Sequence, residues 1–378
     1  MNTQTPSRSA RAEHDRVVRR DLDYIVDALS KELSQMAGTR VLITGGAGFL
    51  GYYLTQALLT ANDTLGAPIQ VVVYDNFMRG IPGWLEQRAE DPHLTVVRHD
   101  ITEPLPADVG AFDYIIHAAS IASPTFYRSH PIETMDANVN GLRHLLEYAR
   151  QRRETDRPIR GFLFFSSSEI YGDPEPSAIP TPETYPGRVS CTGPRACYDE
   201  SKRYGETLCV HFARVYDLPI TVARPFNNYG PGLSLDDRRV PPDFARNVLR
   251  GEDIVMLSDG APTRTFCYVA DAIVGYLKVL VRGRSGEAYN IGVDGPETSI
   301  VDLADRFVAA GQELFGYEGT VVRKSSDDPN YLTDNPTRRC PDITKARTDL
   351  QYDPKITLDD GLRRSLLWYT PFIQPPVS

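Results

Sequence analysis

Cysteine is scarce in this sequence, and no two cysteines form a Cys-x-x-Cys pair. Their odd number favours free thiols in a reducing compartment over a disulfide framework. No run approaches the ~20 apolar residues of a membrane span, and the polar N-terminus lacks the hydrophobic stretch of a secretory signal. We therefore expect a cytoplasmic protein with no membrane contact and no metal site. The cysteines are Cys191, Cys197, Cys209, Cys267 and Cys340.

A basic excess is also absent, because 41 Lys and Arg residues stand against 50 Asp and Glu residues, giving a formal charge of -9. A chain with no surplus of cations to neutralise phosphates is not expected to bind nucleic acid. With 41% hydrophobic and 24% charged residues, the composition is that of an ordinary globular protein. A chain of 378 residues is long enough for two domains.

Residues 1–38 form an N-terminal extension ahead of the first expected strand. Residues 1–12 are polar and are expected to be disordered. Between residues 15 and 36 apolar side chains recur at helical spacing, which predicts an amphipathic helix. This helix either packs on its own domain or contacts another subunit, and the first alternative is favoured. Its apolar positions are Val18, Leu22, Ile25, Val26, Leu29 and Leu33.

Short apolar runs alternate with helical patterns after this extension. Such buried strands separated by helices indicate the α/β class, with a Rossmann-like doubly wound parallel sheet. The expected strands are 40–44, 71–74, 94–98, 114–117, 162–165 and 220–223, and the expected helices are 49–60, 138–150 and 198–215. Beyond residue 224 the pattern loosens, which predicts a smaller mixed α/β domain with a ligand-gripping segment at 227–242 and a long loop at 323–345.

Gly45, Gly48 and Gly51 follow the first strand and open the first helix of this pattern. Glycines there let the backbone approach a pyrophosphate, and the helix N-terminus offers N–H groups to it. Asp75 ends the second strand, where a carboxylate can hold the adenosine ribose hydroxyls and favour NAD over NADP. We therefore assign residues 39–224 to an NAD-binding domain, its sheet completed by part of 264–292. Residues 225–378 form mainly the substrate-binding domain.

Tyr198 and Lys202 are one helical turn apart in the sequence Tyr-Asp-Glu-Ser-Lys. A phenol ionises near pH ~10, which is too high for a base at neutral pH. A cation beside it favours the phenolate. A tyrosine tuned in this way can take a proton from a sugar hydroxyl while a nicotinamide ring takes the hydride.

These motifs, in this order, resemble those of extended short-chain dehydrogenase/reductases that act on nucleotide sugars. The similarity covers about residues 38–369 and rests on 44–51, 100–101, 117–120, 166–172, 198–202, 224–231 and 264–269. It implies NAD as cofactor, Tyr198 as the base, Lys202 lowering the pKa of that base, and a homodimer built on helices 138–150 and 198–215. The implied cofactor-binding residues are Gly45, Gly48, Phe49, Leu50, Gly51, Asp75, Asn76, Asp100, Ile101, Ala118, Ala119, Ser120, Tyr198 and Lys202.

The reactions of this family all begin with oxidation of the sugar C4 hydroxyl, and the sequence Ser167-Ser168-Glu169 helps to distinguish between them. In 4,6-dehydratases the corresponding motif is Thr-Asp-Glu, and its Asp protonates the leaving C6 hydroxyl. Simple 4-epimerases usually lack the glutamate. The Ser-Ser-Glu form resembles the UDP-glucuronate decarboxylases, as do residues 171–175, 193–200 and 327–329. In that family Ser167 would hydrogen-bond the reacting hydroxyl, and Glu169 would either help expel the carboxylate or manage protonation at C5.

The same resemblance places Arg264 near the carboxylate of the substrate, where a planar, always-charged guanidinium suits the task. It places Asn227, Arg239 and Tyr268 at the nucleotide diphosphate or the sugar. Arg238 competes with Arg239 for its role.

Residues 330–339 look like an insertion near the sugar nucleotide, so another nucleotide uronate is a possible substrate. Decarboxylation of a nucleotide-linked glucuronate is the leading hypothesis. A nucleotide-sugar 4-epimerase is the alternative, and an inactive NAD-sensing protein is a third; such a protein would be expected to lose Tyr198 or Lys202, and the sequence has both.

Overall fold

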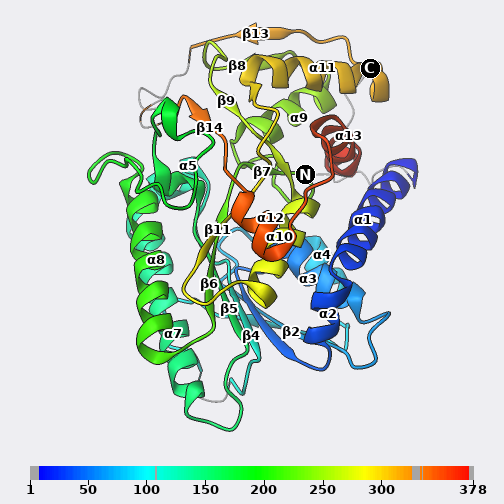
Figure 1. Cartoon of the computed structure of the whole chain (residues 1–378). Coiled ribbons are helices and arrows are strands. Elements are labelled where there is room, and N and C mark those ends of the chain that lie inside the picture. Colours follow the sequence, from blue (N-terminus) through cyan, green and yellow to red (C-terminus); the bar gives the residue numbers. More distant parts are fainter. Residues whose placement is uncertain (1–7, 107–108, 326–332, 334, 374–378) are drawn as a thin grey trace.

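The computed structural model describes residues 8–106, 109–325, 333 and 335–373, and a seven-stranded sheet forms its centre (Figure 1). Every neighbouring pair of strands is parallel, in the order β11-β6-β5-β4-β1-β2-β3. This arrangement confirms the predicted Rossmann-like sheet. The strands are β1 (Arg40–Thr44), β2 (Gln70–Asp75), β3 (Leu94–Arg98), β4 (Tyr114–His117), β5 (Gly161–Phe165), β6 (Ile220–Pro225) and β11 (Ala288–Ile291).

Helices cover both faces of the sheet, which is why its strands are apolar throughout. Helices α3 (Phe49–Ala61) and α10 (Val269–Arg282) lie on one face, and α7 (Leu142–Arg153) and α8 (Ala196–Tyr216) on the other (Figure 1). Successive residues of β1 therefore enter different apolar layers. Val41 and Ile43 pack with α3 and α10, whereas Leu42 packs with α7 and α8.

The predicted helix 138–150 is part of a longer run. Helix α6 (Pro131–Asp136) continues through a π-helical turn, η1 (Ala137–Gly141), into α7. Short elements surround the sheet and carry much of the site. They are α4 (Gly83–Gln87), α5 (Pro124–Ser129), the 3-10 turns η2 (Ser168–Tyr171) and η3 (Pro176–Ala178), β7 (Asn228–Tyr229) and β10 (Cys267–Tyr268).

The smaller C-terminal part lies at the top of Figure 1, above the carboxyl ends of the strands. It contains α9 (Val240–Arg250), β8 (Ile254–Met256), β9 (Thr263–Arg264), β12 (Thr298–Ser299), α11 (Ile300–Phe315), β13 (Val321–Arg323) and β14 (Arg338–Arg339). The chain ends with α12 (Thr344–Leu350), α13 (Leu358–Tyr369) and η4 (Thr370–Phe372). Residues 326–332 and 334 of the predicted loop, including the 327–329 match and part of the 330–339 insertion, lie outside the described residues.

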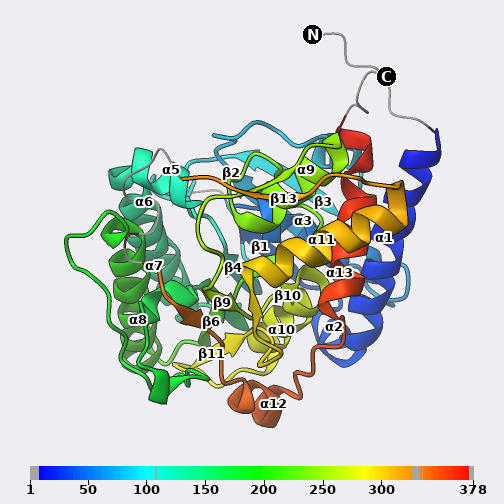
Figure 2. The same cartoon turned by 90° about the horizontal axis from the view of Figure 1, so that it is seen from above.

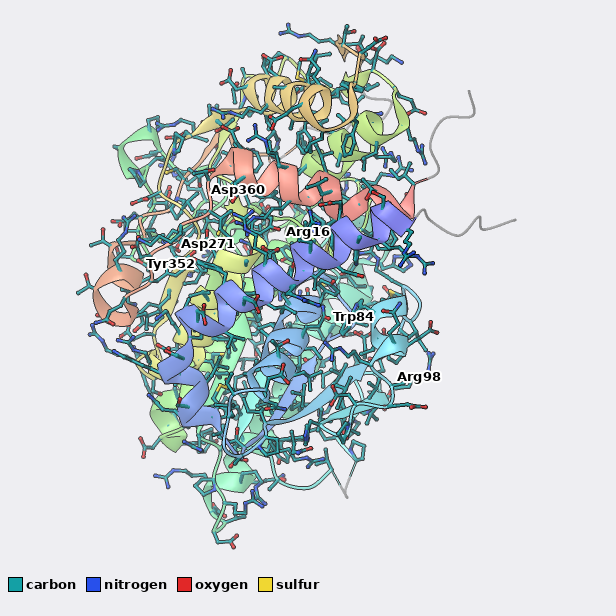
Figure 3. The ribbon with its side chains drawn as sticks, turned by 90° about the vertical axis from the view of Figure 1, so that its right-hand side faces the viewer. Arg16, Trp84, Arg98, Asp271, Tyr352 and Asp360 are labelled. Atoms are coloured by element: carbon teal, nitrogen blue, oxygen red, sulfur yellow. The ribbon has the colours of Figure 1, made fainter. Side chains whose placement is uncertain are left out.

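The N-terminal extension forms α1 (Arg8–Ala28) and α2 (Ser30–Met36). Residues 8–12 are helical, so the prediction of disorder was wrong for them, and residues 1–7 lie outside the described part. Helix α1 runs beside α13 and also contacts α3 and α10 (Figures 2 and 3). It therefore packs on its own chain, as the favoured alternative predicted.

Asp21 anchors α1 in the protein interior. Its carboxylate is fully buried and accepts hydrogen bonds from Tyr53 Oη of α3 (2.7 Å), Tyr268 Oη of β10 (2.6 Å) and Arg364 Nη1 of α13 (2.5 Å). A buried charge needs such partners, because its desolvation is otherwise costly. Within the described ranges, no helix is both long and apolar enough to cross a bilayer.

Candidate active site

The glycine loop joins β1 to α3 at the carboxyl edge of the sheet. Gly45 has φ +73°, and a Cβ there would lie 2.6 Å from the backbone of Ala119 at the end of β4. Gly48 directly precedes the first residue of α3. The loop is thus shaped by residues without side chains and ends at a helix N-terminus, as a pyrophosphate-binding loop requires.

Asp75, at the end of β2, holds this loop in place. Its Oδ2 accepts a hydrogen bond from the backbone N–H of Ala47 at 3.0 Å, and its Oδ1 accepts one from Phe77 at 2.8 Å. Burial raises the pKa of the Asp75 carboxyl. Beside it, Asn76 Nδ2 donates to Asp100 Oδ2 at 3.1 Å. The structure therefore brings the expected ribose-binding positions to the same edge as the glycines.

The remaining residues expected at the cofactor lie along this edge too. Phe49 and Leu50 begin α3 and are partly buried, Ile101 is buried after β3, and Ala118 to Ser120 follow β4. Ser120 Oγ is buried without a hydrogen-bond partner among the described residues. An unpaired buried hydroxyl beside a cradle lined by glycine fits a bound dinucleotide, because a ligand can supply the missing partner.

Gly45→Ala is expected to weaken NAD binding by about 30-fold, because a Cβ at this positive φ meets the Ala119 backbone and costs about 2 kcal/mol. Isothermal titration with NAD measures the effect. Gly316→Ala is the matched control, since Gly316 has φ +66° but open space around its Cβ. Equal loss of affinity in both variants would contradict a close approach at Gly45.

Tyr198 and Lys202 lie one turn apart on the buried face of α8. Lys202 Nζ donates to the carbonyl oxygen of Phe165 at 2.8 Å and lies 5.7 Å from the centroid of the Tyr198 ring. Burial lowers the pKa of Lys202 to about 7. Burial also raises the pKa of Tyr198 to about 12, although a hydrogen bond with Ser167 acts in the other direction. Promotion of the phenolate by Lys202 stays a prediction.

Ser167, Ser168 and Glu169 follow β5, and Ser167 Oγ caps η2 by accepting the Glu169 N–H at 3.2 Å. Arg339 grips the Glu169 carboxylate with two parallel hydrogen bonds, Nη1 to Oε1 at 2.6 Å and Nη2 to Oε2 at 2.5 Å. Arg195 donates to the same carboxylate. Although burial opposes it, the two guanidinium groups hold the pKa of Glu169 well below its usual range.

Arg264 of β9 is the parallel register partner of Arg339 in β14, so the two guanidinium groups belong to one cluster. Arg264 is buried and donates to backbone oxygens, including those of Pro336 (2.5 Å) and Thr263 (2.8 Å). Among the described residues no carboxylate lies within ion-pair distance of it. Burial and the neighbouring Arg339 lower its pKa to about 9. Within the described residues Arg264 therefore has no ion-pair partner, although the more distant charges of Glu169 and Asp173 act on it.

Sequence reasoning did not assign a role to four residues of this cluster. Arg195 and Arg339 bind Glu169, Asp199 lies 3.6 Å from Arg195, and Tyr127 stacks on Tyr198 with ring centroids 5.1 Å apart. Arg195 and Asp199 stand within the quoted motif 193–200, so their spacing of three and one residues from Tyr198 was an available signal. Arg339 ends the segment 330–339, which was placed near the sugar nucleotide, but no motif there singled it out.

The structure does not bring all predicted substrate residues together. Asn227 (φ +44°) donates from Nδ2 to Thr265 O at 2.9 Å, next to Arg264. Arg239 pairs with Asp237 and lies 5.8 Å from the Phe49 ring centroid, whereas Arg238 is exposed, which favours Arg239 of the two candidates. Tyr268 is fully buried and its hydroxyl donates to Asp21 of α1, and its role at the sugar stays a prediction.

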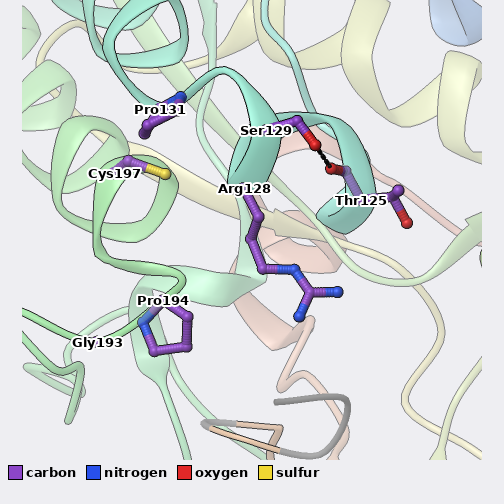
Figure 4. A pocket seen from close by; sticks show the side chains of 7 residues that line it. All are labelled: Thr125, Arg128, Ser129, Pro131, Gly193, Pro194 and Cys197. Atoms are coloured by element: carbon purple, nitrogen blue, oxygen red, sulfur yellow. Dashed lines mark hydrogen bonds between the residues drawn. The ribbon is translucent and has the colours of Figure 1, made fainter. Parts of the chain in front are cut away.

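A cavity of about 580 Å³ opens beside the cluster, between α5 and the turn that leads into α8 (Figure 4). These two elements carry Tyr127 and Arg195. Arg128 of α5 and the turn residues Gly193 and Pro194 all line this cavity (Figure 4).

A glycine cradle at the carboxyl edge of a doubly wound sheet, with a buried Tyr–Lys pair beside it, defines a dinucleotide-dependent enzyme fold. Residues 41–292 match the NAD dependent epimerase/dehydratase family, and the chain belongs to that family.

A curated relative and two solved structures extend this result. UDP-glucuronic acid decarboxylase 5 of Arabidopsis thaliana is 38% identical over 325 residues, which cover 85% of this chain and 87% of the relative. The epimerase Mth375 of Methanothermobacter thermautotrophicus has a TM-score of 0.75 at 29% identity, covering 92% and 95% of the two chains. The UDP-glucuronic acid 4-epimerase of Bacillus cereus, in complex with UDP-glucuronic acid and NAD, has a TM-score of 0.71 at 26% identity, covering 88% and 100%.

Proposed function

We propose that the protein is an NAD-dependent decarboxylase of a nucleotide-linked glucuronate. The substrate is UDP-glucuronate and the product is UDP-xylose or its 4-keto pentose. The name of the Arabidopsis relative supports this substrate, since the two chains share 38% of residues over most of their lengths. NAD is the resident cofactor, in keeping with the family and the glycine cradle.

The buried guanidinium of Arg264, which has no ion-pair partner among the described residues, is the observation that supports the proposal most strongly. Arg195 and Arg339 are neutralised in part by Glu169, whereas Arg264 has only backbone and amide oxygens as described partners. A buried cation of this kind is stabilised by an incoming anion. The C6 carboxylate of a glucuronosyl group supplies that anion, and a planar guanidinium binds it in a fork.

The residues of the chain have distinct roles in this proposal. Tyr198, which is hydrogen-bonded with Ser167, takes the proton of the C4 hydroxyl. The Lys202 ammonium group stays close to the ring of Tyr198. NAD, when bound, accepts the C4 hydride and later returns it. Once C4 is a ketone, the C6 carboxylate is beta to it, and the electrons of the breaking C5–C6 bond flow into the carbonyl. CO2 then leaves without a leaving-group acid, which agrees with Ser168 in the place of the dehydratase aspartate.

A 4-epimerase is the second candidate, because the Bacillus cereus neighbour also binds a uronate and NAD. A carboxylate-binding site is therefore compatible with both reactions. The two differ in mass balance, because only decarboxylation removes carbon.

Incubation of the purified protein with NAD and UDP-glucuronate is expected to release one CO2 per substrate and to leave UDP-xylose or the 4-keto pentose, as measured by mass spectrometry. Product of unchanged mass would point to the epimerase. Turnover of a neutral UDP-hexose, with no reaction of any nucleotide uronate, would exclude the decarboxylase.

We also propose a cytoplasmic homodimer. Of the two helices expected at its interface, 198–215 exposes the apolar side chains of Tyr204 (52% exposed) and Val215 (68%). Exposed apolar residues along one helix are typical of subunit interfaces. Sedimentation analysis measures the assembly state.

A further inference from the structure

The active site contains a second buried carboxyl group, Asp199, which the reaction described above does not use. It follows Tyr198 in α8 and is 5% exposed. Its Oδ2 lies 3.6 Å from Arg195 Nε, beyond hydrogen-bonding distance, and its Oδ1 is buried with no hydrogen-bond partner in the described chain. A buried carboxylate without a partner is costly, whereas a protonated carboxyl group is tolerated more easily.

Glu169 is the opposite case. Two arginines bind it through both oxygens, so it stays ionised and is a poor proton donor. Arg195 links the two acids, because it contacts Glu169 and Asp199. Burial raises the pKa of Asp199 first, and the negative charge of Glu169 raises it further. Pairs of carboxyl groups held in such different environments divide acid and base roles between them.

The groups that face Asp199 come from four elements. They are Arg195, Cys197 and Tyr198 around its own helix, Glu169 of η2, Arg339 of β14 and Tyr127 of α5. Tyr127 Oη is also buried and has no partner among the described residues, and its ring stacks on the Tyr198 ring. Unpaired polar atoms of Asp199 and Tyr127 therefore gather beside the catalytic tyrosine, where a ligand can pair with them.

We propose that Asp199 is a further catalytic residue, the acid that returns a proton to C5 of the sugar after CO2 has left. This role rests on the proposed decarboxylation. Loss of CO2 leaves an enolate across C4 and C5. The O–H bond of Asp199 breaks, its proton bonds to C5, and the enolate electrons form the new C–H bond while the C4 carbonyl is restored. Asp199 is left as a carboxylate beside Arg195 and regains its proton from solvent.

The test is a single turnover of Asp199→Asn with NAD and UDP-glucuronate. The amide keeps the shape of the side chain but cannot donate an acidic proton. NADH formation and CO2 release are expected within about threefold of the wild type, whereas decay of NADH is expected to slow by about 10²-fold or more. Asp199→Glu is expected to restore part of that decay. Glu200→Gln, on the same helix with its side chain 38% exposed, is the matched control and should behave like the wild type.

The outcomes separate this role from the proposed function. If the wild type releases no CO2 from any nucleotide uronate, the decarboxylase proposal and this role fall together. If the wild type releases CO2 and Asp199→Asn re-reduces its ketone at the normal rate, only the role of Asp199 is overturned. A variant that loses NADH formation and its decay equally would show that Asp199 merely positions Arg195. A slow decay in Glu169→Gln instead of Asp199→Asn would assign the proton to Glu169.

Discussion

Tyr198→Phe is expected to abolish oxidation of the sugar, slowing NADH formation about 10³-fold or more while NAD stays bound. The variant lacks only the hydroxyl that accepts the C4 proton, and a positioned general base contributes about 10²–10⁴-fold. A loss of 10³-fold corresponds to about 4 kcal/mol of transition-state free energy. Stopped-flow measurement of NADH formation gives the rate, and isothermal titration gives the NAD affinity.

Tyr216→Phe is the matched control, because it removes a hydroxyl from the same helix at a position that is 39% exposed. Its turnover should equal that of the wild type. Unchanged oxidation in Tyr198→Phe would mean that another group is the base. A parallel loss of NAD affinity would assign Tyr198 to cofactor binding in place of proton transfer.

Arg264→Lys is expected to lower kcat/KM for UDP-glucuronate by about 30-fold or more, with NAD affinity within about threefold of the wild type. Impairing a buried charge pair costs about 2 kcal/mol or more, which corresponds to this factor. A lysine ammonium is a point charge, whereas the planar guanidinium of arginine can bind both oxygens of a carboxylate at once. Steady-state release of CO2 measures the change.

Arg338→Lys tests whether the effect is specific. Arg338 lies in β14 beside Arg339, but its side chain is 40% exposed and pairs with Glu297. Its replacement should leave kcat/KM near the wild-type value. Similar losses in both variants, or a loss of NAD affinity in Arg264→Lys, would contradict a carboxylate-binding role at Arg264.

Most of the sheet could be predicted from the sequence, because each strand is a local apolar run and each crossover helix has its own period. The six expected strands agree with β1 to β6 within two residues at each end. The last strand of the sheet, β11, could not be located more closely than the range 264–292. Its four residues form the edge strand that pairs with β6. Only this pairing in the folded chain shows that they belong to the sheet.

Local pattern and tertiary packing disagree at two places in the chain. Residues 8–12 are polar, yet they extend α1, which is held along α13 by the apolar side chains that follow. Tyr268 stands in a motif of the substrate domain, but its hydroxyl turns to Asp21, 247 residues away in sequence. A buried carboxylate accepts hydrogen bonds from whichever donors the packing brings to it. The spacing of residues in the sequence does not predict which donors these are.

The sequence by itself determined the order of the elements, the glycine loop and the Tyr198–Lys202 pair, because these depend on spacings within one strand or one helical turn. Only the tertiary structure decided the electrostatics of the site. Arg339 reaches Glu169 across 170 residues and keeps it ionised, while Arg264 stays without a carboxylate partner in the described chain. Charge balance in a buried site is a sum over every element packed around it, so it is fixed by the folded chain and not by any segment of the sequence.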